Sequence, residues 1–193
     1  MKRVNAILAT VAICTLFAAN TASAEANLAL RGIGLKAGVV NPDNVNSTLG
    51  AGLIFDLGTL HPHVALQSYA GYWSQTEEAY GVKAGVHDFS FGAKANYMFA
   101  VSNPSIQPYA GAGLGLHLLN SHAETAPVYY GGTLLFPGTS IDDSSVKLGL
   151  DLGGGLRIDQ GGQFAFLADA WFSIVSDVSQ FSLMAGVVYM FGR

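Results

Sequence analysis

The chain has 193 residues, of which half are hydrophobic and only 11% are charged, and it contains 24 glycines. This composition suits a single domain and is poor in charge for a protein dissolved in water. The formal net charge of −4 argues against nucleic acid as a partner.

The first 24 residues have the pattern of a secretory signal peptide. Two basic residues at positions 2 and 3 precede an apolar run, and the small residues at 22–24 form a cleavage motif. The apolar run is short for a bilayer core of ~30 Å, which argues against the alternative of a transmembrane anchor. We therefore predict a signal peptide at 1–24 and one domain at 25–193. Cleavage removes Cys14, the single cysteine, and changes the formal charge to 7 − 13 = −6.

Eight segments of about 10 to 14 residues then alternate between apolar and polar residues, each bounded by turn-forming residues. A tilted membrane strand needs about 9–11 residues, whereas strands of soluble sheets average about 5–6. The lengths favour a membrane barrel over a soluble sandwich, which would show a similar alternation. We predict strands at 28–39, 49–58, 63–73, 88–99, 106–119, 145–158, 163–173 and 180–191.

The two faces of these segments differ in chemistry. One face is uniformly apolar, while the other carries glycines and nearly balanced charges, so we predict that the apolar face meets lipid and the polar face lines the lumen. An eight-stranded barrel is only just wide enough for its side chains, and an unpaired buried ion costs several kcal/mol. We therefore predict a polar plug, with a narrow water path as the alternative, and expect Lys94 to meet an aspartate. The predicted lumen network is Lys36, Asp56, Gln67, Lys94, Asn96, His117, Lys147, Asp151, Arg157 and Asp169.

The connections alternate between long and short along the chain. The gaps at 59–62, 100–105 and 159–162 are short, whereas those at 74–87 and 120–144 are long. Short turns face the periplasm in outer-membrane barrels, so both termini are expected there. With that orientation, aromatic residues form two predicted girdles. The periplasmic girdle contains Phe55, Tyr97, Phe99, Phe164, Tyr189 and Phe191, and the external girdle contains Tyr72, Phe89 and Phe172.

Three strands carry a family resemblance. PYAGAGLGLHLL (108–119), KLGLDLGGGLRI (147–158) and FSLMAGVVYMF (181–191) resemble strands of the small outer-membrane barrels of Gram-negative bacteria, the OmpA/OmpX-like group. The resemblance implies an all-β, eight-stranded antiparallel up-and-down transmembrane β-barrel that is monomeric and contacts outer-membrane lipid and lipopolysaccharide. It also implies recognition of the last strand by the barrel-assembly machinery. Gly192 and Arg193 depart from the pattern, since the family usually ends on the aromatic residue.

No residues form a convincing catalytic, cofactor-binding or metal-binding set. Ser121, His122 and Glu124 superficially resemble a hydrolase set, but they lie too close in sequence for a base, a nucleophile and an orienting acid. His61 and His63 flank a proline without further ligands, which makes a weak metal site. We therefore predict no enzyme activity and no cofactor.

The predicted outer loops are acidic. They contain Asp43, Glu77, Glu78, Asp88, Glu124, Asp142, Asp143 and Asp177 against Lys83 alone. Such a surface fits divalent cations or a basic partner, and plain solvated charge is the alternative.

The longest connection, 120–144, includes the strand-like segment APVYYGGTLLF, for which we predict a hairpin that turns at Gly131-Gly132. Its exposed apolar residues also fit a binding surface. Taken together, the sequence predicts an outer-membrane barrel with a structural or surface-interaction role, for which an extracellular ligand or a host or cell surface is a possible partner. A narrow pore or transport barrel for small or hydrophobic solutes is the second hypothesis. A lipid-modifying enzyme is the third.

Overall fold

The computed structural model describes residues 26–79, 82–103, 105–176 and 178–192. The predicted signal peptide and Cys14 lie outside these residues. Within the described part of the chain, no helix is long and apolar enough to cross a membrane.

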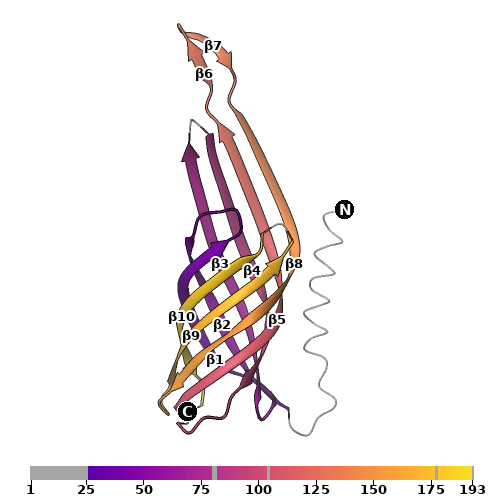
Figure 1. Ribbon diagram of the computed structural model, residues 1–193, viewed down its shortest axis with the longest axis vertical. Helices are drawn as coiled ribbons and strands as arrows, with labels where there is room; N and C mark the ends of the chain where they lie inside the picture. The colour runs from indigo at the N-terminus through magenta and orange to yellow at the C-terminus, as the bar shows by residue number, and fades with distance from the viewer. Residues whose placement is uncertain (1–25, 80–81, 104, 177, 193) are drawn as a thin grey trace.

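Eight antiparallel strands close into a barrel (Figure 1). The order around the ring is β1-β10-β9-β8-β5-β4-β3-β2, so each strand pairs with its neighbours in the chain and β1 pairs with β10. The predicted fold class is confirmed. The barrel strands are β1 (Asn27–Pro42), β2 (Thr48–His61), β3 (Val64–Ala79), β4 (Val82–Met98), β5 (Ile106–Thr125), β8 (Thr139–Asp159), β9 (Phe164–Val175) and β10 (Gln180–Met190).

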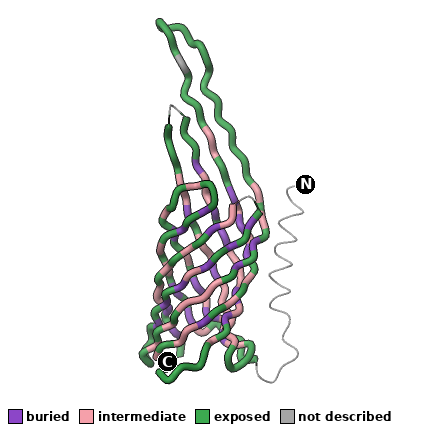
Figure 2. Tube along the Cα trace, in the orientation of Figure 1, coloured by how far each residue is buried: buried purple, intermediate pink, exposed green. Residues whose placement is uncertain are grey.

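The wall of the barrel follows the alternation of the sequence. Leu114 of β5 is 58% exposed on the outer surface and pairs with Leu150 of β8. The next pair, Gly113 and Asp151, lies on the opposite face, where Asp151 is fully buried. A Cβ atom at Gly113 would lie 2.6 Å from Cγ of Lys94, so glycine leaves room there for a large neighbour. Figure 2 shows the resulting mixture of exposed and buried positions around the wall.

Four strands continue well beyond the barrel at one end (Figure 1). The β3–β4 pairing runs to Ala79↔Val82, and the β5–β8 pairing runs to Thr125↔Thr139. We call this four-stranded continuation, residues 74–79, 82–87, 120–125 and 139–144, the extended sheet. The connections predicted at 74–87 and 120–144 are therefore largely strand. Their polar residues suggested loops, but these strands continue a pairing that the barrel wall has already established.

A separate two-stranded hairpin lies at the far end of the extended sheet. Its strands are β6 (Val128–Tyr130) and β7 (Thr133–Phe136). Gly131 and Gly132 join them with φ angles of 56° and 83°, as a two-residue turn with positive φ at both positions requires. The predicted turn is thus confirmed. We call residues 126–138 the tip hairpin.

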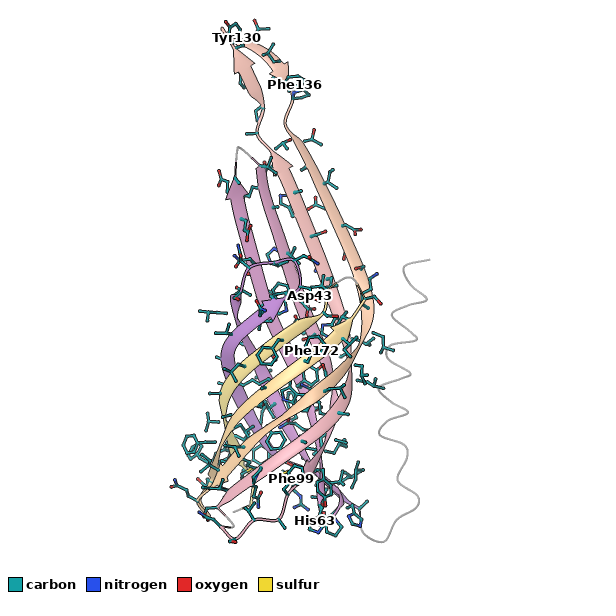
Figure 3. All side chains as sticks on the ribbon, viewed as in Figure 1. Asp43, His63, Phe99, Tyr130, Phe136 and Phe172 are labelled. Carbon is teal, nitrogen blue, oxygen red and sulfur yellow. The ribbon has the colours of Figure 1, made fainter. Side chains whose placement is uncertain are left out.

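The aromatic residues predicted as girdles point outward near the two ends of the barrel wall. At the end with short turns, Tyr97 contacts Phe99 with ring centroids 5.3 Å apart, and Tyr189 contacts Phe164 at 5.5 Å. At the other end, Tyr72 pairs with Phe89 across β3 and β4. Figure 3 shows Phe99 and Phe172 at these two levels. Phe191 and Tyr189 are also in contact at the short-turn end, and Phe55 is half-buried.

Leu114→Lys should lower the free energy of unfolding by about 2–4 kcal/mol, since it places a charge near the middle of the lipid-facing wall. Ile141→Lys is the matched control, because Ile141 is 65% exposed but belongs to the extended sheet. This control should change stability by no more than about 0.5 kcal/mol. Urea unfolding in phospholipid vesicles measures both values, and equal small effects would contradict the position of the membrane on this wall.

Candidate functional site

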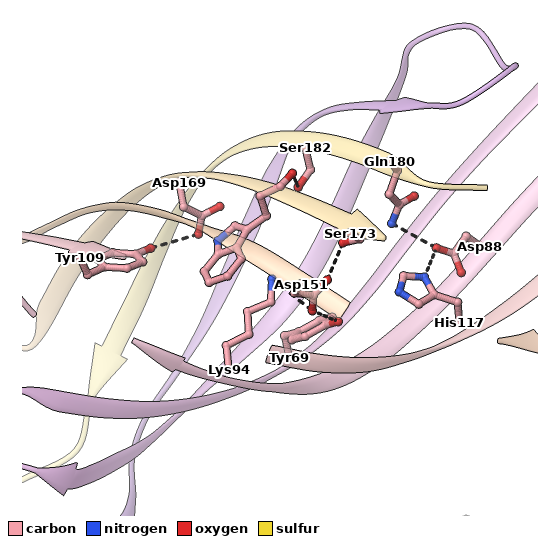
Figure 4. Close-up of polar contacts among 11 residues, drawn as sticks. Tyr69, Asp88, Lys94, Tyr109, His117, Asp151, Asp169, Ser173, Gln180 and Ser182 are labelled. Carbon is pink, nitrogen blue, oxygen red and sulfur yellow. Dashed lines mark hydrogen bonds and ion pairs between the residues drawn. The ribbon is translucent and has the colours of Figure 1, made fainter. Parts of the chain in front are cut away.

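The centre of the barrel is filled by a buried lysine held between aromatic rings (Figure 4). Nζ of Lys94, on β4, lies 4.4 Å from the ring centroid of Tyr69 and 3.8 Å from that of Trp171. It also lies 3.8 Å from Oδ2 of Asp151. Asp151 accepts hydrogen bonds from the Tyr69 hydroxyl at 2.6 Å and from Ser173. Of the three aspartates in the predicted lumen network, Asp56, Asp151 and Asp169, the one that meets Lys94 is Asp151.

A second cluster lies toward the extended end. Nδ1 of His117 is 2.8 Å from Oδ2 of Asp88, and the Gln180 amide donates to the same oxygen at 3.4 Å. Trp73 in turn donates to Gln180 at 2.6 Å. Asp88 is only 1% exposed, so its assignment to the solvated acidic loops was wrong. Asp88 is the first inward residue of β4 within the barrel wall. His117, on the neighbouring strand β5, is its hydrogen-bond partner.

A third cluster closes the short-turn end. Arg157 donates to Asp56 at 2.8 Å, and its other terminal nitrogen lies 3.9 Å from Asp159. Tyr109 donates to Asp169 at 3.3 Å. An apolar cluster packs at this level and fills the remaining space. Its members are Ile54, Tyr109, Ala165, Leu167, Trp171, Val188 and Met190.

The remaining predicted lumen residues also lie on the inward face. Nζ of Lys36 is 5.7 Å from the Tyr69 ring centroid, and Lys147 pairs in register with the inward His117. Gln67 and Asn96 border a small cavity of about 20 Å³ beside Asp56 and Arg157. A space of this size holds about one water molecule. The clusters therefore pack against one another as a polar plug.

Sequence reasoning missed several members of the plug. Trp171 and Ser173 share the parity of the predicted Asp169, and Tyr69 shares the parity of Gln67. Parity was therefore the signal that could have found them. The residues were passed over because the prediction selected charged and amide side chains, although tyrosine, tryptophan and serine can also donate hydrogen bonds inside a barrel.

The hydrolase-like set is not assembled. Nδ1 of His122 lies 2.6 Å from Oδ1 of Asp142, and Nε2 lies 3.7 Å from Glu124. Ser121 precedes His122 in the same strand and therefore faces the opposite side of the extended sheet. The rings of His61 and His63 lie 6.4 Å apart between centroids. Among the described residues, no group of three or more His, Cys, Asp or Glu side chains could hold a metal ion.

A closed antiparallel barrel with an apolar outer wall and a polar core defines an integral membrane β-barrel. The outer membrane protein beta-barrel domain family matches residues 9–191, and the chain belongs to this family of the outer membrane. Comparison with curated protein sequences gives no significant match.

Three solved structures show the same fold. Neisserial surface protein A (NspA) is 18% identical, with 86% of this chain and 100% of that chain covered and a TM-score of 0.62. Ail, the attachment invasion locus protein of Yersinia pestis, is 18% identical, with 83% and 95% covered and a TM-score of 0.51. The outer membrane enzyme PagL is 19% identical, with 79% and 97% covered and a TM-score of 0.50. At these identities the likeness concerns the fold alone.

Lys94 and Asp151 should be energetically coupled. Lys94→Met and Asp151→Asn should each lower the free energy of unfolding by about 3–5 kcal/mol, because each leaves an opposite charge buried. The double variant should lose at least about 1 kcal/mol less than the sum. Lys94→Met combined with Asp56→Asn is the control, and its effects should add within about 0.5 kcal/mol, since no contact joins those residues in the structure. Urea unfolding of the three single and two double variants tests the coupling, which additive losses at positions 94 and 151 would disprove.

His122 should titrate above the usual histidine range. Its hydrogen bond to Asp142 raises its pKa, and Glu124 adds to the effect, although the side chain is solvated. Because the pKa is higher in the folded state, protonated His122 stabilises the extended sheet. This stabilisation is complete below the unfolded pKa of about 6.5 and disappears as the pH rises through the folded pKa. Histidine ring NMR signals followed against pH measure the shift. Asp142→Asn should lower the pKa, and an unchanged titration would contradict the contact.

Proposed function

We propose that this protein is a surface-interaction protein of the outer membrane, with the extended sheet outside the cell and both termini in the periplasm. The observation that carries the proposal is the continuation of β3, β4, β5 and β8 as one ordered sheet beyond the barrel wall. A barrel that served only to span the membrane would not need this continuation.

The sheet is long enough to stand clear of the membrane surface. Val146 is the last outward apolar residue of β8 before the polar stretch, and the tip turn is at Gly131, 146 − 131 = 15 residues away. At about 3.3 Å per residue, this corresponds to roughly 50 Å along the strand. Such a reach supports contact with molecules beyond the immediate headgroup layer.

One edge of the extended sheet is open. β8 pairs with β9 only from Gly149 to Asp159, and no described strand pairs with residues 139–146 on that side. An unpaired edge offers backbone N–H and C=O groups to an incoming strand. Asp142 and Asp143 lie along this edge, and their charges discourage indiscriminate pairing while leaving a basic partner able to dock.

The packed interior favours an interaction role over transport. Lys94, Trp171 and Asp151 occupy the middle of the lumen, and they are at most 4% exposed. An open path for solutes would require these groups to separate. The hydrolase-like set does not support an enzyme, because Ser121 and His122 face opposite ways.

Labelling of intact cells tests the proposed orientation. In a Cys14→Ser background, Thr133→Cys in the tip hairpin should react with a membrane-impermeant maleimide, because the tip lies outside. Gln160→Cys in a short turn is the matched control and should react only after the cells are broken. Labelling of position 160 but not of position 133 on intact cells would reverse the orientation.

Adherence of these cells to an epithelial monolayer tests the interaction itself. Replacing residues 126–138 by Asn-Gly keeps the β5–β8 sheet while removing the tip, and adherence should fall several-fold. Unchanged adherence by a correctly oriented protein would contradict the interaction role. Planar-bilayer recordings of the purified full chain should show no stable single-channel steps, and stable steps would favour the transport hypothesis instead.

A further inference from the structure

We propose that the tip hairpin inserts into the surface of a second, facing lipid bilayer and prefers zwitterionic to anionic lipid. This inference rests on the outward orientation proposed above. It adds a partner of defined chemistry, a lipid surface, to the interaction role.

The tip hairpin is uncharged, apolar and exposed. No Asp, Glu, Lys, Arg or His occurs from position 126 to position 140. The tip also lies at the far end of the molecule, where Figure 3 shows Tyr130 and Phe136 well away from the barrel. Its large exposed side chains are Tyr129 (62%), Tyr130 (78%), Leu134 (48%), Leu135 (52%) and Phe136 (67%).

Apolar side chains occupy both faces of the hairpin. Tyr129 pairs with Leu134, while the next pair, Tyr130 with Thr133, points to the opposite face. A protein partner docking on one face would leave the other face in water. A bilayer surrounds an inserted hairpin, so it covers both faces at once.

The hairpin also lacks support from the rest of the chain. Pro127 and Pro137 separate it from the extended sheet, where Thr139 N–H donates to the Thr125 hydroxyl at 3.0 Å and closes the last pair. The two-stranded sheet β6–β7 is joined to no third strand within the described chain. Such a hairpin is only marginally stable in water, so burial of its side chains in lipid would also stabilise its fold.

The chemistry of the tip and of the sheet below it selects the type of lipid. Tyrosine places an apolar ring in the acyl region and a hydroxyl at the headgroups, as in the aromatic belts of membrane proteins. Just below the tip, the exposed sheet carries Glu124, Asp142 and Asp143, of which the first two contact His122. At 0.01 M salt, where the Debye length is about 30 Å, this excess of carboxylates repels anionic headgroups and leaves zwitterionic headgroups unaffected.

Co-sedimentation with vesicles tests the proposal on the full chain held in nanodiscs. Sucrose-loaded phosphatidylcholine vesicles should pull down the wild-type protein, whereas empty nanodiscs should remain in solution. The double variant Tyr130→Ser, Leu135→Ser should bind at least about tenfold more weakly, because two buried apolar side chains are lost. The control Ile141→Ser removes an equally exposed apolar residue from the sheet below and should bind within about twofold of wild type.

Lipid charge provides the second arm. Vesicles containing phosphatidylserine should bind more weakly at low salt, and this difference should disappear at 1 M salt, where the Debye length is about 3 Å. Failure of wild-type protein to bind neutral vesicles, wild-type binding by the double variant, or stronger binding to anionic vesicles would each overturn the inference. Vesicle binding combined with an unlabelled tip on intact cells would instead refute the proposed orientation and leave the lipid affinity standing.

Discussion

The pairing of β1 with β10 closes the sheet, and the rest of the structure depends on this closure. Inside a bilayer, a backbone N–H or C=O group without a partner costs several kcal/mol, so a sheet can span the hydrocarbon only without open edges. The register from Gly32↔Met190 to Pro42↔Gln180 supplies that closure. Closure then divides the residues of every strand into an outward row and an inward row. The outward rows must meet lipid, and the inward rows must pack against one another.

The inward rows therefore have to balance their own charges in little space. Lys94 does so with one carboxylate and two aromatic rings, an arrangement in which the ring faces supply part of the electrostatic stabilisation. Arg157 is paired separately with Asp56, and Asp88 has His117 as its hydrogen-bond partner. The charges are thus distributed over three levels, and Lys36 and Lys94 share the ring of Tyr69. The burial of Lys94, Trp171 and Asp151 in the middle of the lumen connects the packing of the core to the proposed interaction role.

Local patterns in the sequence were sufficient to predict the eight strands, the inward direction of the Lys94 side chain and the two-glycine turn, because all three follow from local geometry. The partner of Lys94 was not predictable, because it depends on which strands face each other across the lumen: β4 and β8 are not neighbours in the ring. Asp88 was misplaced for a related reason. An acidic residue at a strand end fits a solvated loop equally well until His117 is seen opposite it.

The chain from β5 through β6 and β7 to β8 passes through three regions of different chemistry. Beside the membrane only the outward row is apolar, as at Leu118 and Val146; in the extended sheet the outward positions become His122 and Asp142. Beyond the prolines both faces become apolar again. Water on both sides explains the polar stretch, but it offers no reason for a second apolar region beyond it. Since the barrel gains no packing from that region, its apolar character is best explained by a surface outside this molecule.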